Sequence, residues 1–148
     1  MIKTNTIDRF SVNYNKKNSK GTLFGISRLK FKKMNHLEAT QEITAIIPEI
    51  KNELSDQNTS GIIQIFTDRI REMIRKNENR LLFKSLEKMD HIYKKGDTAL
   101  KNAVENIFIY SLDYLTASCN KEYRRVIFCN ISPDLQKIYF RQIYKPGM

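Results

Sequence analysis

Apolar residues from Met34 onward recur at the spacing of an α-helix, and this period limits the possible folds more than any other feature of the chain. A helix has 3.6 residues per turn, so one buried face takes apolar residues at i, i+3, i+4 and i+7. Ile63, Phe66, Ile70 and Ile74 follow this spacing, with charged residues between them. The 148 residues include only five Gly and three Pro. This composition favours helices over strands joined by tight turns, so the sequence predicts an all-α domain.

Local signals mark where the helices begin and end. Pro48 lies inside the first apolar run and either kinks one helix or opens a second one. The stretch Lys94-Lys95-Gly96-Asp97 predicts a sharp boundary, with lysines ending one helix, Gly96 in the left-handed conformation and Asp97 capping the next helix. We expect Thr59-Ser60 to cap a further helix, and Ser132-Pro133-Asp134 to supply the cap, the first-turn proline and the first-turn acid of the last helix.

These boundaries predict five to seven helices joined by short connectors. Short connectors make neighbouring helices antiparallel, so the expected architecture is an irregular antiparallel bundle of helical hairpins. The helix that carries residues 100–115 is apolar around most of its circumference, and we expect it to be the central and most buried one. A weak alternation within residues 21–33 suggests one short strand before the bundle.

The first 33 residues carry most of the net charge of +10. They hold nine Lys/Arg and one acid, whereas Met34–Met148 holds 17 Lys/Arg and 15 Asp/Glu. Residues 1–20 are basic and polar without a helical period, so we expect a disordered basic arm at 1–33 and a helical domain at 34–148. A second interpretation is that translation starts at Met34 and that residues 1–33 are a mis-annotated leader. The intact mass of the protein from its host distinguishes the two.

Charge within the helical region is also uneven. Residues 34–68 hold one cation and six acids, and residues 69–95 hold nine cations and four acids. The cations of the second segment form a basic stripe that can bind an acidic protein or phosphate. The alternative is that they face solvent or dock the acidic segment, and the matched opposite charges favour this alternative. The candidate partner-binding residues are Arg71, Arg75, Arg80, Lys84 and Lys88.

Motifs for catalysis and for metal binding do not occur in the sequence. It contains no Gly-rich phosphate loop, no C-x-x-C and no H-E-x-x-H. No other His or Cys lies within four residues of His36 or His91, so we expect both to be surface or helix-end residues. The sequence therefore predicts no enzyme, no metal site and no cofactor.

The two cysteines, Cys119 and Cys129, are too few for a disulfide scaffold. Reduced thiols in a cytoplasmic protein are the default expectation, with Cys129 as a small core residue. The sequence has no apolar run near the length of a membrane span and no secretory leader, so we expect no membrane attachment.

Two polar residues fall within the predicted central helix, Asn102 and Asp113. They are candidates for a structural polar core. A buried Asp requires a partner, and the alternative for Asp113 is a partly exposed position or a salt bridge to Arg124 or Arg125.

The stretch Gly96–Val104, continued by Tyr110–Leu115, resembles a recurrent helix in an uncharacterised family of small bacterial all-helical domains. The likeness extends over residues 35–143 and leaves out the arm. Asp113 stands where the family more often has Glu. The family has no established activity; such domains look like immunity-type or other partner-binding proteins, so the resemblance implies an all-helical binding domain.

We therefore expect a non-catalytic domain that binds a protein partner, with an immunity-type inhibitor of a toxin as the most specific form. Such inhibitors work by charge-complementary occlusion, and the acidic segment and the basic stripe are the first surfaces to consider. The alternative is a nucleic-acid-binding accessory protein that uses the arm and the basic stripe.

Overall fold

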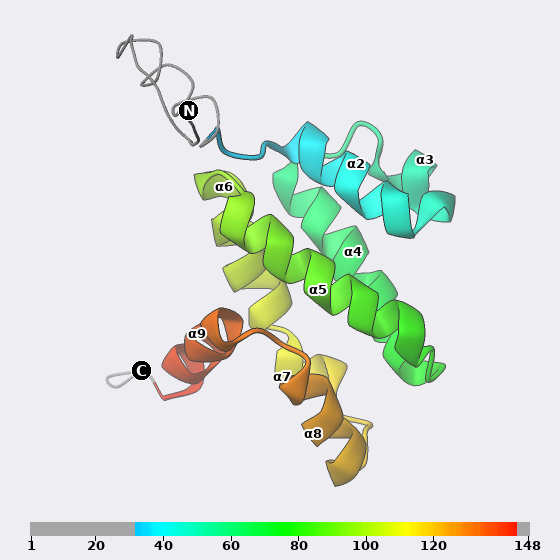
Figure 1. Cartoon of the computed structure of the whole chain (residues 1–148), viewed down its shortest axis with the longest axis vertical. Coiled ribbons are helices and arrows are strands. Elements are labelled where there is room, and N and C mark those ends of the chain that lie inside the picture. Colours follow the sequence, from blue (N-terminus) through cyan, green and yellow to red (C-terminus); the bar gives the residue numbers. More distant parts are fainter. Residues whose placement is uncertain (1–31, 145–148) are drawn as a thin grey trace, which may run out of the picture. The chain divides into compact units, whose positions relative to one another are not determined.

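The computed structural model describes residues 32–144 (Figure 1). The chain divides into two units, Met1–Lys33 and Met34–Met148, and all the helices below belong to the second. Nearly all of the basic arm, and the strand expected in residues 21–33 apart from its last two residues, lie outside the described residues.

Within residues 32–144 the chain forms eight α-helices, one 3₁₀ helix and one π-helix, which confirms the all-α prediction. In chain order they are α2 (His36–Ile46), η2 (Pro48–Ile50, 3₁₀), α3 (Lys51–Leu54), α4 (Thr59–Arg75), α5 (Asn79–Lys95), α6 (Thr98–Ala103), η3 (Val104–Ile109, π), α7 (Leu112–Leu115), α8 (Lys121–Cys129) and α9 (Pro133–Ile143). The 3₁₀ helix continues into α3, and α6, η3 and α7 follow one another along a single run. The elements therefore make seven helical segments.

The α4–α5 pair is an antiparallel hairpin that buries one face of each helix (Figure 1). The cap of α4 is Asn58, whose side chain accepts a hydrogen bond from the Gly61 N–H at 2.8 Å, so the expectation that Thr59-Ser60 supply it is wrong. Asn has a side-chain carbonyl that reaches the free N–H groups of the first turn. The hairpin turns at Asn77, whose φ of 55° lies in the left-handed region that Asn tolerates.

The boundary between α5 and α6 lies where the sequence predicts it, but Gly96 has a different role. Its φ is −72°, so it is not left-handed. Gly96 instead forms a parallel β-bridge with Met34, in which the Met34 N–H donates to the Lys95 carbonyl at 2.7 Å and the Asp97 N–H to the Met34 carbonyl at 2.8 Å. A Cβ at position 96 would lie 2.5 Å from the Ile92 carbonyl oxygen, so this close approach requires glycine. Asp97 caps α6 as predicted.

The run α6–η3–α7 packs against α4, α5 and α9, which agrees with the predicted central position. The π-helical turn was not predicted. Its wider turn places residues five apart on the same buried face, Ala103 with Phe108 and Val104 with Ile109. In an α-helix, one member of each pair would be rotated away from the core. Tyr110 and Tyr114, by contrast, are exposed, so this run is not covered on all sides.

Helices α8 and α9 are the last two helices of the chain. Asn120 and Ser132 cap them, the latter as predicted with Pro133 in the first turn. Gln136 donates to the carbonyls of Phe128 and Ile131, both at 2.8 Å, and so fixes the turn between the two helices. Cys129 is exposed at the end of α8, and the expectation that it is a core residue is wrong because Ile127, two positions earlier, takes the buried face.

Candidate functional site

Three of the predicted partner-binding residues lie next to acids of the same domain. Lys88 donates a hydrogen bond to Glu42 of α2 at 2.5 Å. The pKa of Glu42 is lowered mainly because of this hydrogen bond. Arg75 pairs with Glu72 at 2.8 Å, and Arg71 lies 3.7 Å from Asp68. Because the acidic and basic segments contact each other, much of the basic stripe is occupied within the domain.

The two remaining stripe residues are exposed. Arg80 and Lys84 lie one turn apart near the start of α5, and no carboxylate of the described residues is within 4.0 Å of either. The structure thus does not bring the five predicted residues together into one free surface.

The predicted polar core does not form. Asn102 is exposed on α6, and the side chain of Asp113 is 62% exposed. The helix buries a narrower face than the sequence indicated, since Asn102, Tyr110 and Asp113 are all exposed. The alternative for Asp113 is confirmed, since it pairs with Arg124 at 2.9 Å.

Asp113 belongs to a three-residue network that joins α7, α8 and α9. The Tyr139 hydroxyl donates to Asp113 at 2.6 Å and accepts a hydrogen bond from Arg124 at 3.2 Å. Burial, followed by the contact with Asp113, raises the pKa of Tyr139, and the bond to Tyr139 is the main cause that raises the pKa of Arg124. Arg124 is therefore a cation and Tyr139 a neutral phenol at any physiological pH.

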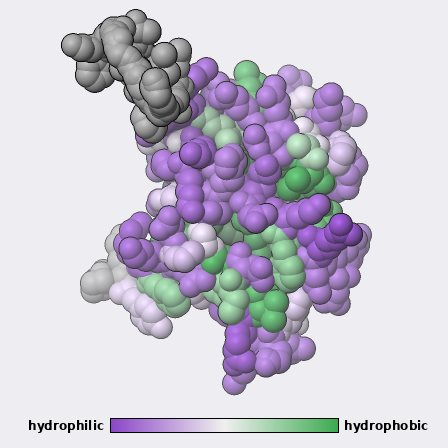
Figure 2. Space-filling model, viewed as in Figure 1, coloured by the Kyte–Doolittle hydropathy of each residue, from purple (hydrophilic) through white to green (hydrophobic). Residues whose placement is uncertain are grey.

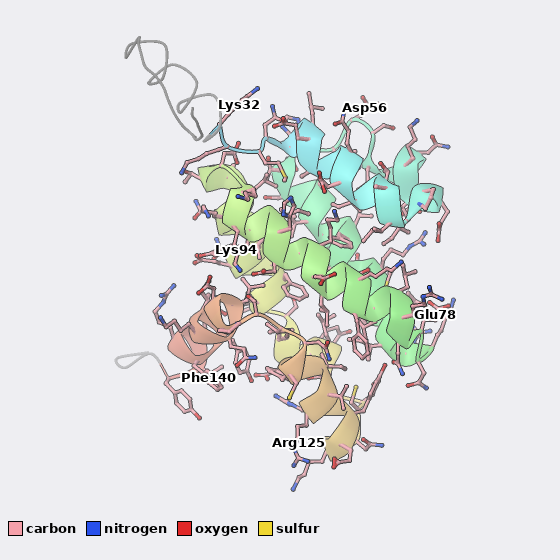
Figure 3. All side chains as sticks on the ribbon, viewed as in Figure 1. Lys32, Asp56, Glu78, Lys94, Arg125 and Phe140 are labelled. Atoms are coloured by element: carbon pink, nitrogen blue, oxygen red, sulfur yellow. The ribbon has the colours of Figure 1, made fainter. Side chains whose placement is uncertain are left out.

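A groove of about 410 Å³ lies beside this network, between α8 and α9. Figure 3 labels one residue from each wall, Arg125 on α8 and Phe140 on α9. The α8 wall is largely basic and the α9 wall largely apolar. The lining residues are Lys121, Arg124, Arg125, Phe128, Tyr139, Phe140, Ile143 and Tyr144.

A second hollow of about 360 Å³ adjoins the groove, and Tyr139 and Ile143 line both. Its other walls come from the η3–α7 segment and include Tyr110, Asp113 and Tyr114. The Arg71 guanidinium lies 5.4 Å from the Tyr114 ring centroid, so one predicted partner-binding residue does border this surface.

The aromatic rings that line the groove contact one another. Phe128 and Tyr139 meet edge to face with centroids 5.0 Å apart, Tyr139 and Phe140 do so at 5.4 Å, and Phe140 stacks on Tyr144 at 6.2 Å. We call the whole surface the aromatic face. It consists of Tyr110, Tyr114, Phe128, Tyr139, Phe140, Ile143 and Tyr144. In Figure 2, some of the apolar residues lie in the lower part of the view, where Figure 1 places α7–α9, and others lie at the upper right.

Sequence reasoning missed the aromatic face, although a signal for it was present. Tyr110 with Tyr114, and Phe140 with Tyr144, are aromatic pairs at i and i+4 that lie outside the buried spacing of their helices. Residues at that spacing share a helix surface, so a second aromatic stripe beside the core stripe indicates a surface with another use.

A polar cluster holds α9 against the π-helix. Tyr93 donates to Glu105 at 2.8 Å, and burial followed by this bond raises the pKa of Tyr93 to about 12. Gln142 donates to the Glu105 carbonyl at 3.0 Å, at the turn where π-helical bonding begins. The Gln142 bond positions α9 and therefore one wall of the groove, while the Tyr93 bond joins α5 to the π-helix.

In residues 32–144 no group of three or more His, Cys, Asp or Glu is placed to hold a metal ion. Among the same residues, no helix has the length and apolar character needed to cross a bilayer. Burial raises the pKa of the Cys119 thiol, which makes this cysteine a poor nucleophile.

Comparison with known proteins gives a family and no described activity. The family described as "Domain of unknown function (DUF7674)" matches residues 40–145, most of the helical region. The chain belongs to this family. No curated protein and no solved structure matches it. The match includes α4–α9 and thus the whole aromatic face.

Proposed function

We propose that this domain is a non-catalytic protein-binding module and that its partner contacts the aromatic face. The observation that carries the proposal is the clustering of exposed apolar side chains. Seven large hydrophobic residues are exposed in the described part of the chain, and five lie on this face: Tyr110 (78%), Tyr114 (68%), Phe140 (46%), Ile143 (44%) and Tyr144 (74%). A contiguous apolar patch on a folded domain marks an interaction surface.

The residue types support the same conclusion. Tyr, Phe and Arg are enriched at the centres of protein interfaces because they bury a large area and still offer polar contacts. The aromatic face combines such rings with Arg124, whose guanidinium lies 4.8 Å from the Phe128 ring centroid. These rings and Arg124 are held by contacts within the domain, which reduces the entropy that binding has to overcome.

An immunity-type inhibitor is the more specific form of this proposal. It rests on the likeness of the sequence to small helical immunity-type domains, and it requires a toxin whose active surface the aromatic face would cover. Co-expression with the product of the neighbouring gene tests it, since an inhibitor would restore growth to cells that make an active toxin.

Site-specific photo-crosslinking tests the general proposal. A photoreactive phenylalanine analogue at Tyr144 should crosslink to a partner in the native host, and the same analogue at Lys84 should not. The captured protein is then purified, and its affinity is measured calorimetrically for the native chain and for the Tyr110→Ala/Tyr144→Ala variant. We expect the variant to bind at least about tenfold more weakly. Equal affinity for both chains would exclude the aromatic face as the binding surface.

Nucleic-acid binding remains the second candidate because Arg80 and Lys84 are exposed and lie one turn apart. Such binding would weaken steeply with salt, since it releases counterions. A gel shift of the full chain and of its Arg80→Glu/Lys84→Glu variant at low and moderate salt tests it. A shift that persists at moderate salt and disappears in the variant would favour nucleic acid.

A further inference from the structure

The groove between α8 and α9 separates charge from apolar surface. Its lining contains three cations, Lys121, Arg124 and Arg125, all from α8, and no carboxylate. The opposite wall is supplied by Phe140 and Ile143 of α9 and by its C-cap residue, Tyr144. A ligand that fills this groove therefore meets positive charge along one edge and hydrocarbon along the other.

The three cations can accept a new anionic partner. No carboxylate of the described residues lies within 4.0 Å of Lys121. Arg125 is held by Glu122 at 3.0 Å, but their side chains are 64% and 76% exposed, and such a surface pair is weak enough to exchange.

Arg124 is fixed in position and still has free donors. Both of its hydrogen bonds, to Asp113 and to Tyr139, use Nη2. The Nη1 and Nε donors have no hydrogen-bond partner among residues 32–144, and a guanidinium offers five N–H groups in all. A carboxylate in the groove would find a prepositioned donor there.

The two hollows indicate a chain segment as the occupant. They share Tyr139, which is buried, and Ile143, which is exposed, so a segment that crosses Ile143 can place one apolar side chain in each hollow. The second hollow adds Tyr110 and Tyr114, which extend the apolar surface beyond the reach of a single side chain. Peptide recognition in grooves uses such spaced apolar anchors with charges at the edge.

We propose that the aromatic face binds an acidic amphipathic segment of the partner, with its carboxylates on Lys121, Arg124 and Arg125 and its aromatic or aliphatic side chains in the two hollows. This inference rests on the proposed function, because it specifies the chemistry of the partner at the same surface. It also locates the relevant basic residues on α8 and not on the predicted stripe of α4 and α5.

Selection of binding peptides tests the chemistry. A phage-displayed library of random linear peptides is selected against the full chain, and the enriched sequences are compared with the unselected library. We expect enrichment of Asp and Glu together with Leu, Phe or Trp. Enrichment of neutral or basic peptides, or no enrichment at all, would overturn the inference.

Matched charge reversals then locate the binding surface. The affinity of a selected peptide is measured by fluorescence anisotropy for Lys121→Glu/Arg125→Glu and for Arg80→Glu/Lys84→Glu, which change the net charge by the same amount. We expect the α8 variant to lose at least about tenfold in affinity and the α5 variant to lose much less. Equal losses, or a larger loss in the α5 variant, would contradict the assignment to α8. Thermal melts establish that both variants fold.

The two proposals fail in different ways. If Tyr144 crosslinks to a partner whose affinity depends on the aromatic face, but the library enriches no acidic peptide, the acidic segment is wrong and protein binding stands. If the captured partner binds the Tyr110→Ala/Tyr144→Ala variant unchanged, protein binding at this face is wrong whatever the library selects.

Discussion

Phe66 in α4 and Phe140 in α9 are the same residue type in amphipathic helices of one domain, yet Phe66 is fully buried and Phe140 is 46% exposed. The difference lies in what surrounds each helix. Helix α4 packs against α2, α5, α6 and η3, whereas α9 packs chiefly on η3. The comparison teaches that the hairpin α4–α5 forms the stable body of the domain, while the α8–α9 end keeps aromatic surface available for contact.

Truncating each phenylalanine gives the largest expected difference between the two regions. Phe66→Ala should destabilise the domain by about 3–5 kcal/mol, because it leaves a cavity in a packed core. Phe140→Ala should cost about 1 kcal/mol or less, since surface substitutions away from special features have small effects. Urea unfolding followed by circular dichroism measures both. Similar losses in the two variants would show that α9 is as much a part of the core as α4.

Gly96→Ala tests the junction that holds the body of the domain together. A Cβ would lie 2.5 Å from the Ile92 carbonyl oxygen and 2.7 Å from the Leu100 Cβ, so backbone has to move. We expect a loss of about 1–3 kcal/mol, the usual cost of overpacking. The control is Ala99→Gly, at an exposed position of α6, where the loss should be about 1 kcal/mol or less. A neutral Gly96→Ala would mean that the Met34 bridge does not require glycine.

Tyr139→Phe tests the network at the other end of the domain. It removes the hydroxyl that contacts Asp113 and Arg124 but keeps the ring against Phe128, so the expected loss is about 1 kcal/mol. Asp113 and Arg124 still pair with each other in the variant. A much larger loss by urea unfolding would show that the network stabilises the fold and does not only position Arg124.

The smallest expected change in stability comes from breaking the ion pair between Glu42 of α2 and Lys88 of α5. Lys88→Ala should cost about 0.2–1 kcal/mol at neutral pH, the range of partly exposed ion pairs. The pKa of Glu42 is lowered in the folded chain, so this contribution is complete above its unfolded value of about 4.3 and is lost as the pH falls through the folded value. The stability difference between native and variant chains should therefore shrink between about pH 5 and pH 3. A difference that does not change over this interval would contradict the pairing.

Most of the helix boundaries could be predicted because their signals are local. Asp97 and Ser132 each accept a hydrogen bond from the backbone N–H three residues later, and Pro133 has a backbone angle suited to a first turn. These signals do not depend on the rest of the fold. The prediction that Gly96 is left-handed was wrong, because its backbone conformation depends on Met34, which lies next to it in space but 62 positions earlier in the chain.

The candidate site was harder to predict, because exposure depends on which helices cover a surface. Asp113 and Tyr110 belong to a helix that is apolar around most of its circumference, so the sequence pattern indicates that Tyr110 is buried and leaves open whether Asp113 is buried or partly exposed. The structure leaves both exposed, since α4, α5 and α9 cover only part of that helix.

The sequence by itself determined that this chain is helical, where its helices begin, and that opposite charges divide between its first two helical regions. These properties follow from residue spacing and from hydrogen bonds between near neighbours. Only the tertiary structure decided that the acidic and basic segments contact each other, and that Arg124 and the two exposed aromatic pairs meet around one surface, with Tyr139 largely buried beside them. Such contacts join residues far apart in the chain, and their formation depends on how whole helices pack against one another.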